Sequence, residues 1–382
     1  MENKKSVLLY SILVVYLLIK FFLFETSNYV VFQNLVNPIF WLLFATLTYI
    51  VLKDYEVRTK YKYDKVQNII IILISFIIVY FGLGLVVGYQ YSPYSHTLMN
   101  IFKNLIMFIP IILFQEYVRY KLLVTDKKSK FLYIIVSLFY TAIILNVHSF
   151  IDNTASNVSL FQYVCESLLP SLTTSFLCTY LALNVKWDVS FYYRALMVAL
   201  PILVPILPAF NWLMAAIIEI VLPFIIYLSI NNLDIIKSRL SRRVRDKSGA
   251  LSNIVFVVFV SVFVMFIVGV FKYMPVAIMS NSMVPKFRRG DAVVVLKCDN
   301  KCLNELKVYD IIYFRVDSDF IVHRIVDINT VNGEIVYTTK GDNNNSVDHW
   351  DLKKSDIKGK VMFSIPFVGY PSVMLSEFLF KG

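Results

Sequence analysis

Nine long runs of apolar residues dominate the first three quarters of this 382-residue chain. A membrane-spanning helix needs roughly 20 apolar residues, with a range of about 17–25. The chain is 58% hydrophobic and 16% charged, whereas soluble domains have roughly 45–50% apolar and about 25% charged residues. We therefore expect eight or nine spans, because several runs are short, crowded or broken by proline. The runs lie near residues 6–24, 39–52, 67–88, 101–118, 131–147, 167–185, 195–210, 213–230 and 252–274.

The positive charge of the chain is distributed unevenly. Residues 1–275 hold 23 Lys/Arg and 13 Asp/Glu, whereas residues 276–382 hold 14 and 13. With the N-terminus inside and the spans alternating, the inside loops hold 20 Lys/Arg and the outside loops hold none. Basic residues accumulate in cytoplasmic loops. The pattern predicts a cytosolic N-terminus and an extracytoplasmic C-terminal segment, with membrane lipid rather than nucleic acid as the neighbour of this charge.

After Lys272 the continuous apolar runs give way to short alternating segments separated by turns. Asn332-Gly333 predicts a hairpin between two of them. We expect a polytopic α-helical membrane domain followed by a small, mostly β exported domain. Strands are predicted at 291–296, 310–315, 320–327, 334–339 and 358–364. The expected parts are a membrane domain at 1–234, a basic cytosolic linker at 235–250, a transmembrane anchor at 251–274 and an extracytoplasmic domain at 275–382.

The chain has four cysteines. Cys165 and Cys178 lie near or inside a span and are expected to pack as small apolar residues. Cys298 and Cys302 lie in the exported segment, where oxidation is permitted, so a loop disulfide and a free pair both remain open. No metal is expected, because the histidines of this segment lack zinc-like spacing to these cysteines.

Beyond the ninth run stands the motif Ser280-Asn281-Ser282-Met283-Val284-Pro285. A serine becomes a nucleophile when a base accepts its proton. The candidate base is His323, because an imidazole titrates near neutral pH. An acid to orient the imidazole is available at Asp342 or at Asp348.

These motifs, in this order, resemble type I signal peptidases of the ER type. The form with His323 implies a Ser-His rather than a Ser-Lys enzyme. Tyr309 stands where the family usually has a glycine. The resemblance covers about residues 255–375, and its other segments are Arg289-Gly290-Asp291, Lys340-Gly341-Asp342-Asn343-Asn344, 308–314 and 365–370.

The resemblance implies a role for each matching catalytic residue. Ser282 would be the nucleophile and His323 the general base. Asp348 would be the charge relay, and Asp342 is also needed in some members of the family.

The resemblance also implies how the substrate would be held. The Ser280 hydroxyl and the Ser282 N–H would form the oxyanion hole. Met283 would shape the small-residue pockets together with Pro285, and it would touch the bilayer. No cofactor is implied.

The implied function is that of a membrane-bound serine endopeptidase that removes signal peptides from exported preproteins at small-x-small sites. Preproteins, membrane lipid and the protein translocon are the expected partners. The topology predicts a multi-pass plasma-membrane protein, and the usage of Ile, Lys, Asn and Tyr points to a Gram-positive bacterium. The alternative is a transporter or sensor that carries a non-catalytic β domain. The complete set of Ser282, His323 and Asp342/Asp348 favours the peptidase.

The first 250 residues exceed what an anchor requires. Glu116 and Arg119, with His148 two spans' length away, share residue types with intramembrane CAAX-type proteases, but the paired glutamate of that pattern is missing. We favour an ion pair near the membrane interface. An accessory domain that recruits substrate or partner is the simplest prediction for this region.

Overall fold

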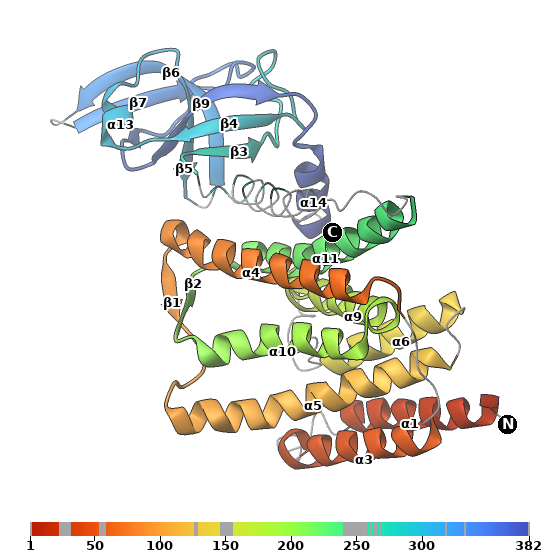
Figure 1. The fold of residues 1–382 in the computed structure, drawn as a ribbon. Helices are drawn as coiled ribbons and strands as arrows, with labels where there is room; N and C mark the ends of the chain where they lie inside the picture. Colours follow the sequence, from red (N-terminus) through yellow and green to blue (C-terminus); the bar gives the residue numbers. More distant parts are fainter. Residues whose placement is uncertain are drawn as a thin grey trace. The chain divides into compact units, whose positions relative to one another are not determined.

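The structure is a computed structural model in which two compact units are distinguished, Met1–Ser261 and Val262–Gly382. The first unit is helical and the second is mostly β, and each is described by itself (Figure 1). The described residues are 2–22, 32–52, 59–125, 129–145, 156–239, 271–317, 319–331 and 334–380, with single positions between 255 and 269. Most of the ninth apolar run lies outside the described residues.

A helix lies at each of the first eight apolar runs. These helices are α1 (Glu2–Phe22), α3 (Asn37–Val51), α4 (Lys62–Val87), α5 (Leu98–Val124), α6 (Lys130–Ile144), α9 (Leu169–Asn184), α10 (Trp187–Leu203) and α11 (Trp212–Arg239). The smaller elements of this unit are η2 (Phe32–Val36), β1 (Tyr89–Tyr91), α8 (Asn157–Tyr163), η3 (Val164–Leu168) and β2 (Ile206–Pro208). Strands β1 and β2 pair with each other in antiparallel fashion.

Four of the described helices are long and apolar enough to cross a membrane. They are Asn34–Val51, Lys62–Val87, Leu98–Val124 and Trp212–Leu233, and two shorter apolar helices are Leu8–Phe22 and Lys130–Ile144. The predicted polytopic helical region is therefore confirmed with four candidate spans, and the predicted number of eight or nine is not confirmed. Helices α9 and α10 have 16 and 17 residues. Both are shorter than the four candidate spans, and the apolar run at 195–210 extends beyond the end of α10, which stops two residues after Pro201.

Local sequence signals explain where several helices begin and end. The Thr97 side chain accepts a hydrogen bond from the backbone N–H of Asn100 at the start of α5. Ser129 caps α6 in the same way. Helix α4 ends at Val87, and the following Gly88 has a φ of 95°, in the region that glycine adopts readily.

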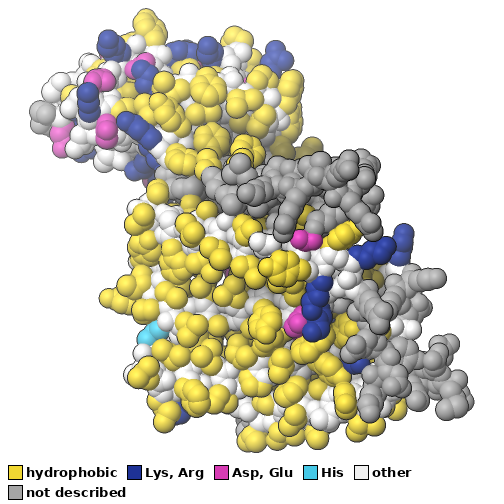
Figure 2. Space-filling model, in the orientation of Figure 1, with side chains coloured by type: hydrophobic (Ala, Val, Ile, Leu, Met, Phe, Trp, Pro, Cys, Tyr) yellow, Lys and Arg dark blue, Asp and Glu magenta, His cyan; other side chains and the backbone are white. Residues whose placement is uncertain are grey.

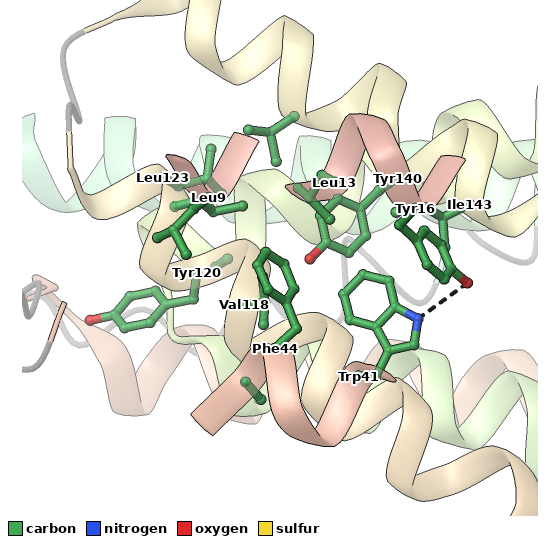
Figure 3. Close-up of a cluster of buried hydrophobic side chains, with 14 of the residues drawn as sticks. Leu9, Leu13, Tyr16, Trp41, Phe44, Val118, Tyr120, Leu123, Tyr140 and Ile143 are labelled. Carbon is green, nitrogen blue, oxygen red and sulfur yellow. Dashed lines mark hydrogen bonds between the residues drawn. The ribbon is translucent and has the colours of Figure 1, made fainter. Parts of the chain in front are cut away.

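Helices α1, α3, α5 and α6 meet in a cluster of buried side chains (Figure 3). Aromatic rings supply much of its volume, with Tyr16 and Trp41 arranged edge to face at 5.3 Å between centroids. Trp41 Nε1 donates to the Tyr16 hydroxyl at 3.3 Å, and that hydroxyl donates to Asn37 Oδ1 at 2.8 Å. The polar atoms of these rings thus have partners despite their burial.

The outer surface of the helical unit is apolar. Hydrophobic side chains cover most of its face in Figure 2, and charged ones are few there. Leu85, Leu98 and Phe131 are exposed by 81%, 87% and 73%. Soluble monomers rarely expose large contiguous apolar patches. This surface therefore fits a membrane environment.

The second unit is a seven-stranded antiparallel sheet with the order β3-β4-β9-β5-β6-β7-β8. Its elements are β3 (Tyr273–Ala277), β4 (Ala292–Lys297), α13 (Asn300–Asn304), β5 (Ile311–Val316), β6 (Asp319–Val331), β7 (Glu334–Lys340), β8 (Leu352–Lys353), β9 (Ile357–Ile365) and α14 (Tyr370–Phe380). The five predicted strands are confirmed, and β3, β8 and the two helices are additions. Val331 pairs with Glu334 across the predicted hairpin, whose turn residues lie outside the described part.

The sheet buries side chains on both faces. Ile311 belongs to one hydrophobic cluster and Ile312 to another, as expected for neighbouring residues on a strand. Met283 packs in the first cluster. His323 is paired with Ile312 in the register, so the imidazole lies on the face of the second cluster.

Candidate active site

Ser282 lies in the turn segment between β3 and β4. Its neighbour Met283 is completely buried in the hydrophobic cluster, which fixes this segment to the sheet. The Ser282 carbonyl accepts a hydrogen bond of 2.8 Å from the backbone N–H of Asn343. A Cβ atom added to Gly341 would lie 2.8 Å from the same carbonyl oxygen. The loop around residues 341–343 therefore packs directly against the serine backbone.

His323 lies on β6 and joins the serine to a carboxylate. Its Nε2 is 3.1 Å from Ser282 Oγ, and its Nδ1 is 2.7 Å from Asp348 Oδ2. The side chains of His323 and Asp348 are only 7% and 6% exposed. Because a carboxylate accepts hydrogen bonds, the proton of the neutral imidazole resides on Nδ1, and Nε2 is left to accept from Ser282. This geometry can convert the serine hydroxyl into a nucleophile.

Asp342 is directed to a different partner. The Arg324 guanidinium donates to both of its carboxylate oxygens, from Nε at 2.8 Å and from Nη2 at 2.7 Å. Arg324 Nη1 also donates to the carbonyl of Tyr309 at 3.0 Å. The hydrogen bonds to Asp342 raise the pKa of Arg324 above its ordinary value. The two candidate acids thus have separate positions, and Asp348 is the one beside His323.

The other predicted site residues surround Ser282. Ser280 is exposed, and its Oγ is 3.1 Å from Ser282 Oγ. Pro285 is exposed, whereas Met283 has no exposed surface. The expected contact of Met283 with the bilayer is therefore wrong, because the core that anchors the serine loop encloses this side chain.

Two residues beside Asp348 were not singled out in the sequence. Thr339 Oγ1 donates to Asp348 Oδ2 at 2.6 Å, and Trp350 Nε1 donates to Thr339 Oγ1 at 3.3 Å. Threonine and tryptophan carry no obvious chemistry, so residue type alone gives no signal. The alternation of β7 does place Thr339 on the same face as buried Tyr337, which is the available hint.

The Arg-Gly-Asp motif has a structural role. Asp291 accepts from the backbone N–H of Arg288 at 2.9 Å and of Phe367 at 3.2 Å. Gly290 has a φ of 92°, and an added Cβ would collide with the Tyr370 ring. The motif joins the serine segment to the start of α14.

The structure also shows how the four cysteines and the potential metal ligands are arranged. Cys298 and Cys302 form a disulfide around α13. Cys178 is buried and Cys165 is half-buried, and both are free. In the part of the chain that the structure describes, no group of three or more His, Cys, Asp or Glu residues is arranged to hold a metal ion.

Comparison with a family model finds similarity in the C-terminal part of the chain. Residues 251–348 match the family model described as signal peptidase, peptidase S26. Signal peptidase complex catalytic subunit SEC11 of Candida tropicalis is 34% identical over 113 residues, and those of Chaetomium globosum and Verticillium alfalfae are 38% identical over 111. Each alignment covers 27% of this chain, and 65%, 63% and 63% of the respective relatives. The chain therefore spans slightly less than two thirds of the length of these relatives.

The matched region contains Ser282, His323, Asp342 and Asp348. The C-terminal domain is accordingly similar to type I signal peptidases of the ER type, as its motifs indicate. The family match leaves out the whole helical region before residue 251.

Proposed function

We propose that this protein is a membrane-bound serine endopeptidase that removes N-terminal signal peptides from exported preproteins. The observation that carries the proposal is the hydrogen-bonded chain from Ser282 through His323 to Asp348, within a domain similar to signal peptidase catalytic subunits. No cofactor is required for this chemistry. The alternative of a transporter or sensor with an inactive β domain is not favoured, because all three groups are present within hydrogen-bond distance.

The reaction begins with attack of Ser282 Oγ on the scissile carbonyl. His323 Nε2 takes the hydroxyl proton, and Asp348 stabilises the resulting imidazolium through Nδ1–H. The Ser282 N–H and the Ser280 hydroxyl stabilise the oxyanion. His323 then protonates the leaving amine, and water activated by the same imidazole releases the signal peptide from Ser282.

The substrate adds to the domain as an extended strand, with alternate side chains in pockets. Strand β3, which leads to Ser282, stands at one end of the strand order, so one of its edges has no neighbouring strand among the described residues. Main-chain pairing supplies affinity in this arrangement. Shallow pockets near Met283 and Pro285 select small residues at positions −1 and −3 of the preprotein.

The membrane arrangement is part of the proposal. Eight or nine spans place the N-terminus in the cytosol and the catalytic domain outside a bacterial plasma membrane, with Gram-positive origin suggested by residue usage. The parts are a membrane domain at 1–234, a basic cytosolic linker at 235–250, an anchor at 251–274 and the catalytic domain at 275–382. Residues 1–250 form an accessory domain that recruits the preprotein substrate, the translocon or another partner, and membrane lipid surrounds the spans.

The proposal is tested by mapping the products of a preprotein that carries Ala-x-Ala before its cleavage site. Membranes containing the full chain should produce a single cut after the second alanine, as read by mass spectrometry. A matched preprotein with tryptophan at position −1 should remain uncut, and so should the alanine form with Ser282→Ala membranes. Equal cleavage of the alanine and tryptophan forms would refute the small-residue specificity, and cleavage by Ser282→Ala would refute the enzyme assignment.

A further inference from the structure

Asp348 is held by more than His323. Its Oδ2 accepts from Thr339 Oγ1 at 2.6 Å, in addition to His323 Nδ1 at 2.7 Å. The backbone N–H of Asp348 donates to the Thr339 carbonyl at 2.9 Å. Thr339 is completely buried, and Trp350 Nε1 donates to its hydroxyl at 3.3 Å. Both the main chain and the side chain of Thr339 therefore fix the carboxylate.

The direction of each hydrogen bond in this chain follows from the inventory of donors and acceptors. An indole nitrogen can only donate, and an ionised carboxylate can only accept. The Thr339 hydroxyl has one proton, so it accepts from Trp350 and donates that proton to Asp348. The same carboxylate oxygen receives the Nδ1 proton of His323. Nε2 is then the bare nitrogen that faces Ser282 Oγ.

We propose that Thr339 and Trp350 form a positioning pair that fixes the Asp348 carboxylate and, through it, the productive tautomer and orientation of His323. The inference rests on the proposed peptidase function and deepens it. Neither residue contacts the reacting atoms, so each acts through Asp348. Without this pair, water would bond the carboxylate oxygen, and the carboxylate could then rotate. The hydrogen bond from Thr339 holds the carboxylate in one orientation.

The neighbouring Thr338 provides a matched control. It lies on the same strand, but the alternation of β7 turns its side chain to the opposite face from Thr339. Thr338→Val removes the same hydroxyl from the same strand without touching Asp348. A general effect of threonine loss on the sheet would appear in both variants.

The experiment compares Thr339→Val, Thr339→Ser, Thr338→Val and Trp350→Phe in the full-length chain, with kcat and KM measured on the Ala-x-Ala preprotein. Thr339→Val should lower kcat by about 10- to 100-fold with KM unchanged, because a hydrogen bond to a charged group is lost. Thr339→Ser should retain kcat within about threefold, since the hydroxyl returns. Thr338→Val should stay within about twofold, and Trp350→Phe should fall by about three- to tenfold. In an Asp348→Asn background, Thr339→Val should add less than about twofold.

Three outcomes overturn the inference. The first is a folded Thr339→Val with kcat within twofold of the wild type, and the second is a loss that Thr339→Ser does not restore. If Thr339→Val does not fold, Trp350→Phe decides, and an unchanged kcat in that variant is the third. If Ser282→Ala keeps cleaving, the proposed peptidase function is refuted. If Ser282→Ala is inactive but Thr339→Val is fully active, only the inference of a positioning pair is refuted.

Discussion

Both units of this protein contain a buried cluster of ionisable side chains, and the two clusters differ in access and in pairing. In the β unit, the chain from Asp348 through His323 leads outward to Ser282, which is partly exposed beside exposed Ser280. In the helical unit, Glu116 and Arg119 are completely buried, and Arg119 Nη2 lies 3.2 Å from Glu116 Oε1. A buried charge becomes a candidate reaction centre when it is connected to a surface where substrate can arrive.

The cluster of the helical unit is also less completely paired. Glu116 Oε1 accepts from Arg194 Nη1 at 2.6 Å, and the Arg119 guanidinium lies 4.0 Å from the centre of the Tyr140 ring. Arg119 Nη1 donates to the Ser175 carbonyl at 2.9 Å. Glu116 Oε2 and Arg119 Nε have no hydrogen-bond partner among the described atoms. The expected ion pair is thus present, it is buried in the helical core, and its contacts tie α5 to α9 and α10.

The largest expected effect is a loss of activity in variants of the β unit. His323→Ala and Asp348→Asn should each lower turnover by about 10³–10⁴-fold while the chain stays folded, because base and orienting acid act as a unit. Turnover per folded molecule of a preprotein measures this. Asp342→Asn is the matched control, since Asp342 pairs with Arg324. A dead Asp342→Asn beside a near-normal Asp348→Asn would transfer the orienting role to Asp342.

The second effect separates the units by stability. Glu116→Ala should destabilise the helical unit by about 3–5 kcal/mol, because it leaves two buried guanidinium groups without their carboxylate. The loss would be seen as a lower midpoint of thermal unfolding in detergent. Turnover per folded molecule should remain unchanged. Lost turnover at unchanged stability would place part of the chemistry in the helical unit.

A third, smaller effect concerns the loop that supports the nucleophile. Gly341→Ala should lower kcat/KM by roughly 10- to 100-fold, since the new Cβ would press on the Ser282 carbonyl. Gly82→Ala in α4 is the control, because nothing lies within 4 Å of its added Cβ. That control should leave cleavage unchanged and stabilise the helix by about 0.5–1 kcal/mol. Equal cleavage by Gly341→Ala and the wild type would show that this loop does not position the serine.

The smallest effect concerns Tyr309, which occupies a position where the family usually has glycine. Its φ is 76°, a region that costs a non-glycine residue about 1–2 kcal/mol, and its side chain is 75% exposed. Tyr309→Gly should therefore stabilise the β unit by about 0.5 kcal/mol after the entropy of glycine is subtracted. Chemical denaturation would measure this change. A destabilisation beyond about 1 kcal/mol would mean that the exposed ring contributes packing that outweighs the backbone strain.

The sequence anticipates the features that depend on local pattern. Continuous apolar runs become helices and alternating segments become strands, since burial follows the period of each element. Ser282 and His323 are candidates because their residue types carry chemistry, whereas the choice of Asp348 as the charge relay rests on the family resemblance. The bond from Thr339 to Asp348 and the pairing of Asp342 with Arg324 join strand residues to the loop after β7. Such contacts between a strand and a loop depend on tertiary packing, which no local period of the sequence encodes.

The same distinction holds in the helical unit. The positions of the apolar runs predict that Arg194 lies in a cytosolic loop. It belongs instead to α10, and its guanidinium donates to Glu116, 78 positions away in the sequence. Helix–helix contacts of this kind depend on which faces pack together. His148, the third residue of the protease-like pattern in this region, lies outside the described residues.

We assign the chemistry of this protein to the β unit, with Ser282 as the nucleophile. The most direct test of this assignment is single-turnover cleavage of an Ala-x-Ala preprotein by the full-length wild type, Ser282→Ala and Glu116→Gln, each at equal folded concentration. We predict complete cleavage by the wild type and by Glu116→Gln, and less than about 0.1% of that rate for Ser282→Ala. The assignment would be contradicted if Ser282→Ala cleaved the preprotein at the wild-type rate, or if folded Glu116→Gln did not cleave it.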